Sequence, residues 1–339
     1  MTSSMRRLPT LSNPPTPPRG TAGPTAPDPR ASERGKAIVW ILVLLLVAGA
    51  AFAVYWFAFR GGPGGGASTK LASTVVPAGA DTVAGIDAGA LLSSPELADL
   101  LKKQGVDVEA VKAKLAESGV KPEDLRSVVV AADVPDAGAP EVFLAVQTTA
   151  DAKAVKGALG ALKAMIPGDA GDKIDLSNVQ AFDGGLVLAG SGPFFDQAAA
   201  LAKGQGKGGM SAELAQVRDA LDTSAPIWFA TTLPKDMSKG MGGMGKQIFG
   251  NGTPTHAGVS IRVGSKIDIK AALRIDGADA AKVADDLGGF LSMAGMVAKG
   301  PQAELLKGLE LGSSGAVLTL TMSLTAEQAK SLSESRLPF

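Results

Sequence analysis

The sequence predicts an α+β protein in which a tandem duplicated module, an antiparallel sheet with helices on one face, follows one transmembrane helix. Three observations predict this arrangement. Residues 37–59 carry no charge, a helix-like segment at 149–165 recurs 128 positions later, and the order strand–strand–helix–strand–strand–helix occurs twice. The predicted divisions are a disordered Pro-rich cytoplasmic tail (1–36), the transmembrane helix (37–59), a Gly-rich linker (60–70), a first α+β repeat (71–204) and a second one (205–339).

The segment 37–59 has the length and composition of a membrane anchor. At 1.5 Å of rise per residue it spans the roughly 30 Å hydrocarbon core of a bilayer with some tilt. Aromatic side chains near its two ends suit the two membrane interfaces. The residues that mark the anchor and its ends are Ala37, Trp40, Tyr55, Trp56 and Phe59.

Charges on the two sides of this segment predict its orientation. Six Arg and Lys residues precede it, whereas Arg60 and Lys70 are the basic residues of the linker, so the N-terminus is expected in the cytoplasm and the C-terminal part outside it. A cleaved signal peptide is the alternative. The apolar run continues well past the cleavage-like Ala48–Ala50, and signal peptides usually have apolar regions of about 7–15 residues. We therefore expect the segment to be retained in the cell membrane.

The repeat rests on a gapless alignment of residues 149–165 (TADAKAVKGALGALKAM) with 277–293 (GADAAKVADDLGGFLSM). Each helix follows a predicted strand, at 141–147 and 266–275. We expect Thr148 and Asp276 to cap these helices, each three positions before an acidic residue. The positions that are identical in the two segments are Ala150, Asp151, Ala152, Val155, Leu159, Gly160 and Met165 in the first.

Composition excludes several classes of function. The chain has no cysteine, which rules out disulfides, thiolate catalysis and Cys-based metal sites. Residues 71–339 carry 25 basic and 31 acidic side chains, and a net negative domain is unsuited to nucleic acid, whose binding depends on neutralised phosphates.

The sequence also contains motifs that imitate functional sites. Residues 240–247 (GMGGMGKQ) match part of a phosphate-binding loop, but Gln247 replaces the required Ser or Thr and no strand leads directly into the glycines. His256, the only histidine, is expected in a surface loop rather than in catalysis. No catalytic residue, cofactor site or metal site is therefore predicted.

The functional expectation is a non-enzymatic interaction domain. Phe194 and Phe195 form the most conspicuous aromatic pair and could offer one ring to a partner. The segment Val76–Thr82 (VPAGADT), followed by a strand and a Leu-rich helix, resembles uncharacterised bacterial envelope proteins with a single N-terminal anchor, a resemblance that implies no activity. We expect a bacterial envelope protein whose partners are the lipid bilayer, through the anchor, and an unidentified envelope protein or ligand.

Two alternatives stay open. The protein could signal across the membrane through its Pro-rich tail, which would need a docking partner in the cytoplasm. It could instead be an envelope hydrolase that uses paired carboxylates brought together by folding, since such pairs cannot be recognised in one sequence.

Overall fold

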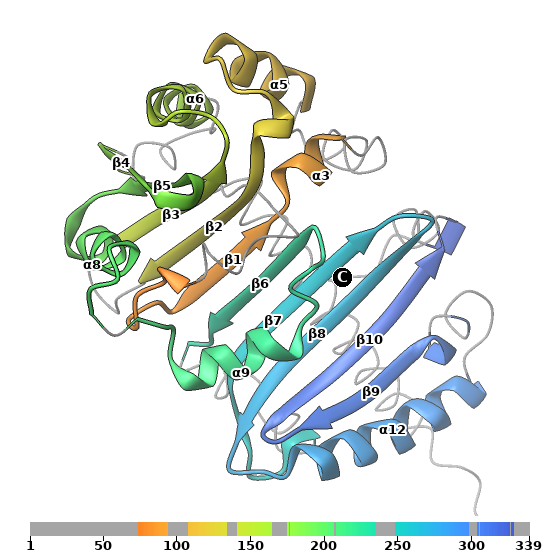
Figure 1. The fold of residues 1–339 in the computed structure, drawn as a ribbon. Helices are drawn as coiled ribbons and strands as arrows, with labels where there is room; N and C mark the ends of the chain where they lie inside the picture. The colour runs from red at the N-terminus through yellow and green to blue at the C-terminus, as the bar shows by residue number, and fades with distance from the viewer. Residues whose placement is uncertain are drawn as a thin grey trace, which may run out of the picture.

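The protein forms one antiparallel sheet with helices, which confirms the predicted α+β class (Figure 1). The strand order is β4-β5-β3-β2-β1-β6-β7-β8-β10-β9. Of the helices within the described ranges, none combines the length and apolarity needed to cross a membrane. The predicted tail, anchor and linker (residues 1–70) lie outside the described residues, which begin at Thr74. The computed structural model describes residues 74–93, 108–133, 141–164, 175, 177–206, 208–234, 248–297, 304, 306–325 and 327–328.

Strands and helices follow one another along the whole described part of the chain. The strands are β1 (Thr82–Ile86), β2 (Leu125–Asp133), β3 (Glu141–Thr148), β4 (Asn178–Phe182), β5 (Leu186–Gly190), β6 (Ile227–Thr232), β7 (Thr253–Val263), β8 (Lys266–Asp276), β9 (Leu309–Ser314) and β10 (Val317–Thr325). The helices are α3 (Ala88–Ser93), α5 (Val108–Glu117), α6 (Ala152–Ala164), α8 (Gly192–Ala202), α9 (Ala212–Ala220) and α12 (Ala280–Val297), with 3-10 turns η1 (Pro122–Asp124) and η2 (Asp183–Gly185).

Strands β1 and β6 meet at the centre of the sheet, so the two predicted repeats share one sheet. The pair is antiparallel, with Thr82 opposite Thr231 and Gly85 opposite Trp228. The strands follow outward in the order β1-β2-β3-β5-β4 on one side and β6-β7-β8-β10-β9 on the other.

Helices cover both faces of the sheet, which corrects the expectation that they lie on one face. In β3, Phe143 and Ala145 belong to the core that includes α8, whereas Leu144 and Val146 belong to the core that includes Val155 of α6. Alternate residues of a strand point to opposite faces, so α8 and α6 lie on opposite sides of the sheet. The continuous apolar runs of β2 and β3 are typical of strands buried on both faces.

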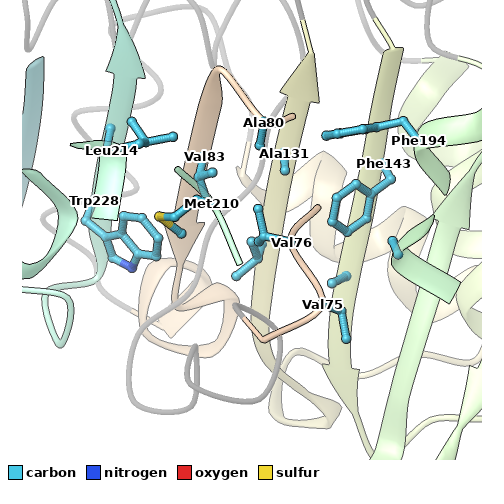
Figure 2. Packing of buried hydrophobic residues seen from close by; sticks show 14 of the residues in the cluster. Val75, Val76, Ala80, Val83, Ala131, Phe143, Phe194, Met210, Leu214 and Trp228 are labelled. Atoms are coloured by element: carbon cyan, nitrogen blue, oxygen red, sulfur yellow. The ribbon is translucent and has the colours of Figure 1, made fainter. Parts of the chain in front are cut away.

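The core under α8 and α9 spans the centre of the sheet (Figure 2). Trp228 is fully buried there and lies over Gly85 of the neighbouring strand. A Cβ atom at Gly85 would come within 2.4 Å of the indole ring, so only glycine leaves room for it. The other labelled members of this core are Val75, Val76, Ala80, Val83, Ala131, Phe143, Phe194, Met210 and Leu214.

The helices α6 and α12 are capped by Asp151 and Asp279 rather than by the predicted Thr148 and Asp276. Asp151 accepts a hydrogen bond from the backbone N–H of Ala154 at 2.7 Å, and Asp279 accepts one from Ala281 at 2.9 Å. A carboxylate at this position satisfies an unpaired N–H group and faces the positive end of the helix dipole. Ser211 caps α9, because its hydroxyl accepts a hydrogen bond from Leu214 N–H at 3.1 Å.

The contact between Gly85 and Trp228 predicts a position that does not tolerate a methyl group. We expect Gly85→Ala to lower the free energy of unfolding by about 1–3 kcal/mol, because the buried indole must shift. Urea denaturation of residues 71–339 measures this change. Gly160→Ala in α6, where an added Cβ meets no atom within 4 Å, is the matched control and should be neutral or stabilising. Equal stability of the two variants would contradict the close packing at the seam.

Candidate functional site

The aromatic pair that the sequence offers to a partner is part of the core. Phe194 and Phe195 are 3% and 1% exposed, and Phe194 contacts the Phe143 ring edge-on at a centroid distance of 5.5 Å. Burial under α8 leaves neither ring available at the surface, which corrects that expectation. The predicted anchor residues, and the glycine-rich segment 240–247, lie outside the described residues.

His256 lies in β7 rather than in a loop. It is paired with Thr232 on one side and with Arg274 on the other. Burial and the positive charge of Arg274 lower its pKa, against a smaller opposing effect of carboxylates such as Glu213. The structure does not gather three or more His, Asp or Glu side chains into a possible metal site anywhere in the described ranges.

His256 belongs to a row of polar residues across five strands and Asp81, the residue just before β1, which we call the polar row. Asp133 is paired with Glu141, and the backbone of Asp81 bonds to the strands on both of its sides, to Ala132 and from Thr232. These residues become neighbours only through the register of the strands, so the row cannot be recognised in the sequence. Its members are Glu141, Asp133, Asp81, Thr232, His256 and Arg274.

The acidic half of the polar row has a structural task. A carboxylate oxygen of Glu141 accepts a hydrogen bond from the backbone N–H of Phe194 at 3.0 Å and so caps α8, whose own cap residue Ser191 makes no such bond. Burial, together with the charges of Asp81 and Glu141, raises the pKa of Asp133, which also shares a hydrogen bond with Asp81.

Arg274, the basic residue of the polar row, pairs with a neighbouring carboxylate and is mostly buried. Arg274 donates to Asp276 at 2.8 Å, and its side chain is 15% exposed. Within the described residues, its Nε and Nη1 atoms are buried without a hydrogen-bond partner. Because these atoms are shielded from solvent, the polar row offers no accessible guanidinium to a ligand.

A more accessible feature lies at the outer end of the second half, beside α12. An apolar pocket of about 400 Å³, which we call the α12 groove, opens between α12 and the residues leading into β9. Its volume falls within the range of small-ligand sites, and its lining is mostly apolar with a few polar groups, as such sites usually are. The lining residues are Gly288, Leu291, Ser292, Gly295, Met296, Leu306, Lys307 and Leu309.

The outward face of α12 changes character along its length. Lys282, Asp285 and Asp286 are exposed in the first half, whereas residues 288–297 contain no charged residue. Met293 and Met296 are 60% and 81% exposed, the large apolar side chains of the described residues that lie most open to solvent. These two methionines lie on the helix that forms one wall of the α12 groove, so the exposed apolar surface and the groove adjoin.

Glycines keep the groove open. A Cβ added at Gly288 or Gly295 would meet no atom of the described residues within 4 Å. Each glycine costs a helix roughly 0.5–1 kcal/mol relative to alanine, and no contact within the described residues requires it at these positions. Among the residues that the structure describes, the groove thus has open space over these two glycines.

Comparison with known proteins adds no assignment. No model of a known protein family matches the chain, and no curated protein matches it. Two crystal forms of the protein TP0453 share a distant likeness in structure. Form III has a TM-score of 0.40 at 11% identity over 78% of this chain and 97% of that one, and form I has 0.36 at 8% over 78% and 96%. Likeness at this level carries no conclusion about fold or function.

The acidic half of the polar row predicts an unusual pH dependence. Because the folded state raises the pKa of Asp133, its contribution to stability is complete below the unfolded value of about 3.9 and is lost as pH rises through the folded pKa. We expect Asp133→Asn to raise the free energy of unfolding at neutral pH, by less than about 1 kcal/mol, and to have little effect near pH 4. Thermal unfolding measured across this range tests the sign.

Asp222 is the matched control of opposite sign. Burial alone would raise its pKa, but hydrogen bonds from Ser224 and Arg262 outweigh burial and lower it. Its stabilising contribution is therefore present above about pH 3.9 and is lost as pH falls through the folded pKa. Asp222→Asn should destabilise the protein at neutral pH. The same direction of change in both variants would contradict the account of Asp133.

Proposed function

We propose that the protein is a membrane-anchored bacterial envelope protein whose extracytoplasmic domain binds an apolar group of another molecule without catalysing a reaction. The observation that carries the proposal is the α12 groove, with Met293 and Met296 exposed beside it. Fully burying one methionine side chain contributes roughly 1.5–3 kcal/mol, so two methionines and the groove can support specific binding. The uncharged segment 37–59 supports the membrane part of the proposal.

The chemistry of the described residues favours binding over catalysis. The lining of the α12 groove provides the Ser292 hydroxyl and the Lys307 ammonium group, but no carboxylate or imidazole. Asp81 and Asp133, the paired carboxyl groups, are in hydrogen-bond contact. Glycoside hydrolases hold their carboxyl groups about 5–9.5 Å apart to leave room for sugar or water, so this pair does not support the hydrolase alternative.

We also propose that the two halves of the sheet arose by duplication. Supporting it, the β2–β3 and β7–β8 pairs each contain a register shift near the same end, one pair apart in the repeat alignment. The pairing moves from Leu125–Thr148 to Ser127–Gln147 in one, and from Pro254–Ile275 to His256–Arg274 in the other. The cap residues Asp151 and Asp279 support it further, because they lie 128 positions apart, the spacing of the sequence repeat.

The anchor makes a prediction about extraction. The full-length protein should stay with membranes during alkaline carbonate washing, because 23 apolar residues in lipid do not depend on surface charge. A variant without residues 37–59 should be released, and protease added to spheroplasts should digest residues 71–339 of the full-length protein. Release of the intact full-length protein, or protection of its C-terminal part, would contradict the proposed topology.

The groove makes a prediction about ligand capture. The chain contains no cysteine, so Ser292→Cys in the groove can carry a photo-crosslinker at one site, and adducts formed in native membranes can be identified by mass spectrometry. We expect Gly295→Leu, which fills the groove, to reduce adduct formation several-fold.

Gly289→Leu is the matched control for this experiment. It adds the same side chain to the same helix at an exposed position that does not line the groove, and it should leave adduct formation unchanged. The groove is not the binding site if both variants form adducts as the parent does, or if the parent forms none.

A further inference from the structure

We infer that the uncharged end of α12, residues 288–297, docks on the surface of the bilayer that holds segment 37–59. Met293 and Met296 insert among the lipids, and the α12 groove takes one acyl chain. This inference rests on the proposed function, because the anchor is what holds the domain close to a bilayer. It goes further by naming the ligand class as membrane lipid.

The length of the tether makes such contact attainable. Fourteen residues separate Phe59 from Thr74, the first described residue. Fourteen residues can reach at most about 50 Å when fully extended. A tether of this kind holds the domain near the bilayer at an effective concentration in the millimolar range. A contact too weak to recruit a free protein therefore suffices to orient a tethered one.

The exposed side chains suit lipid. Methionine is unbranched and polarisable, and it adapts to irregular apolar surroundings better than a branched side chain does. Helices that lie at a membrane interface place apolar side chains about 5–10 Å into the boundary between headgroups and acyl chains. On α12 the charged Asp285 and the apolar Met296 are eleven positions apart, or about 16 Å along the helix axis. The helix can therefore insert its end while its first half stays in water.

The α12 groove is concave and mostly apolar, so it suits a single acyl chain better than the flat surface of another protein. Leu291, Leu306 and Leu309 line it, and open space lies over Gly288 and Gly295. Exposed Lys307 stands at the same groove, where its ammonium group can meet a headgroup phosphate while its methylene stem stays against apolar atoms. One lysine contributes little electrostatic attraction, and residues 71–339 are net negative, so the docking depends on apolar insertion.

A single fluorescent label tests the inference on the full-length protein in phospholipid vesicles. Because the chain has no cysteine, Met296→Cys can carry an environment-sensitive fluorophore alone, and Ala281→Cys, exposed in the charged half of α12, is the matched control. We expect a blue-shifted emission and several-fold stronger quenching by lipid-borne quenchers at position 296 than at 281. Changing the vesicles from zwitterionic to partly anionic lipid should alter the quenching little.

A second variant and a flotation assay separate the possible outcomes. Met293→Glu in the protein labelled at 296 should reduce the lipid quenching several-fold, while circular dichroism confirms the fold. Equal, solvent-like signals at positions 296 and 281 would overturn the docking. Shielding at position 296 that grows with protein density, without quenching by lipid, would also overturn it, because it indicates contact with a second copy of the protein. Failure to float with vesicles after an alkaline wash would contradict the anchor and the docking together. Flotation without lipid quenching contradicts the docking alone.

Discussion

The pairing of β1 with β6 is the interaction on which the rest of the structure depends. These strands are 145 residues apart at their first residues, yet their backbones form the ladder that makes one sheet of two halves. The side chains at this seam fit closely. Trp228 occupies the space that Gly85 leaves free, and the hydroxyl groups of Thr82 and Thr231 meet at 2.8 Å on the other face. A seam that is filled on both faces holds the outer strands of each half in fixed relation.

The strands of the two halves differ in how polar they are. Strands β3 and β5 are covered by α8 on one face and by α6 on the other, and their central residues are apolar and buried. In β8 of the second half, Ile269 and Ile275 belong to the core beneath α12, whereas Asp268 and Lys270 alternate with them on the other face. Ala272, on that second face of β8, belongs to the core beneath α9, so the second half is also covered on both faces near the seam. The α12 helix packs on the opposite face from α9, against β9 and β10 at the outer end of the sheet.

Much of the secondary structure could be predicted because it depends on local pattern. Strands β2, β3 and β8 have the apolar or alternating runs that predict them, and Ser211, a residue type typical of helix caps, caps α9. Strand β7 was harder, because Pro254 and the flanking glycines predict a loop. Pro254 lies beside the register shift in the β7–β8 ladder, and a proline is tolerated in a strand where pairing is interrupted.

The candidate site could be predicted only in part. The uncharged stretch 288–297 is visible in the sequence, but its solvent exposure depends on how α12 lies against β9 and β10. The aromatic pair shows the opposite case. Phe194 and Phe195 follow Pro193 near the start of a helix, a place compatible with exposure, and only the packing of α8 on β3 and β5 buries them. The polar row follows from strand register, which single residues do not reveal.

A disulfide across the seam would test the single ten-stranded sheet most directly. The chain has no cysteine, and the hydroxyl groups of Thr82 and Thr231 are 2.8 Å apart, so Thr82→Cys with Thr231→Cys should form an intramolecular disulfide on mild oxidation. Thr82→Cys with Thr319→Cys is the control, because β10 lies four strands from β1, about 19 Å away. The account predicts nearly complete crosslinking of the first pair and none of the second. Little crosslinking at Thr82 and Thr231, with both thiols free in a folded protein, would show that the halves do not share a sheet.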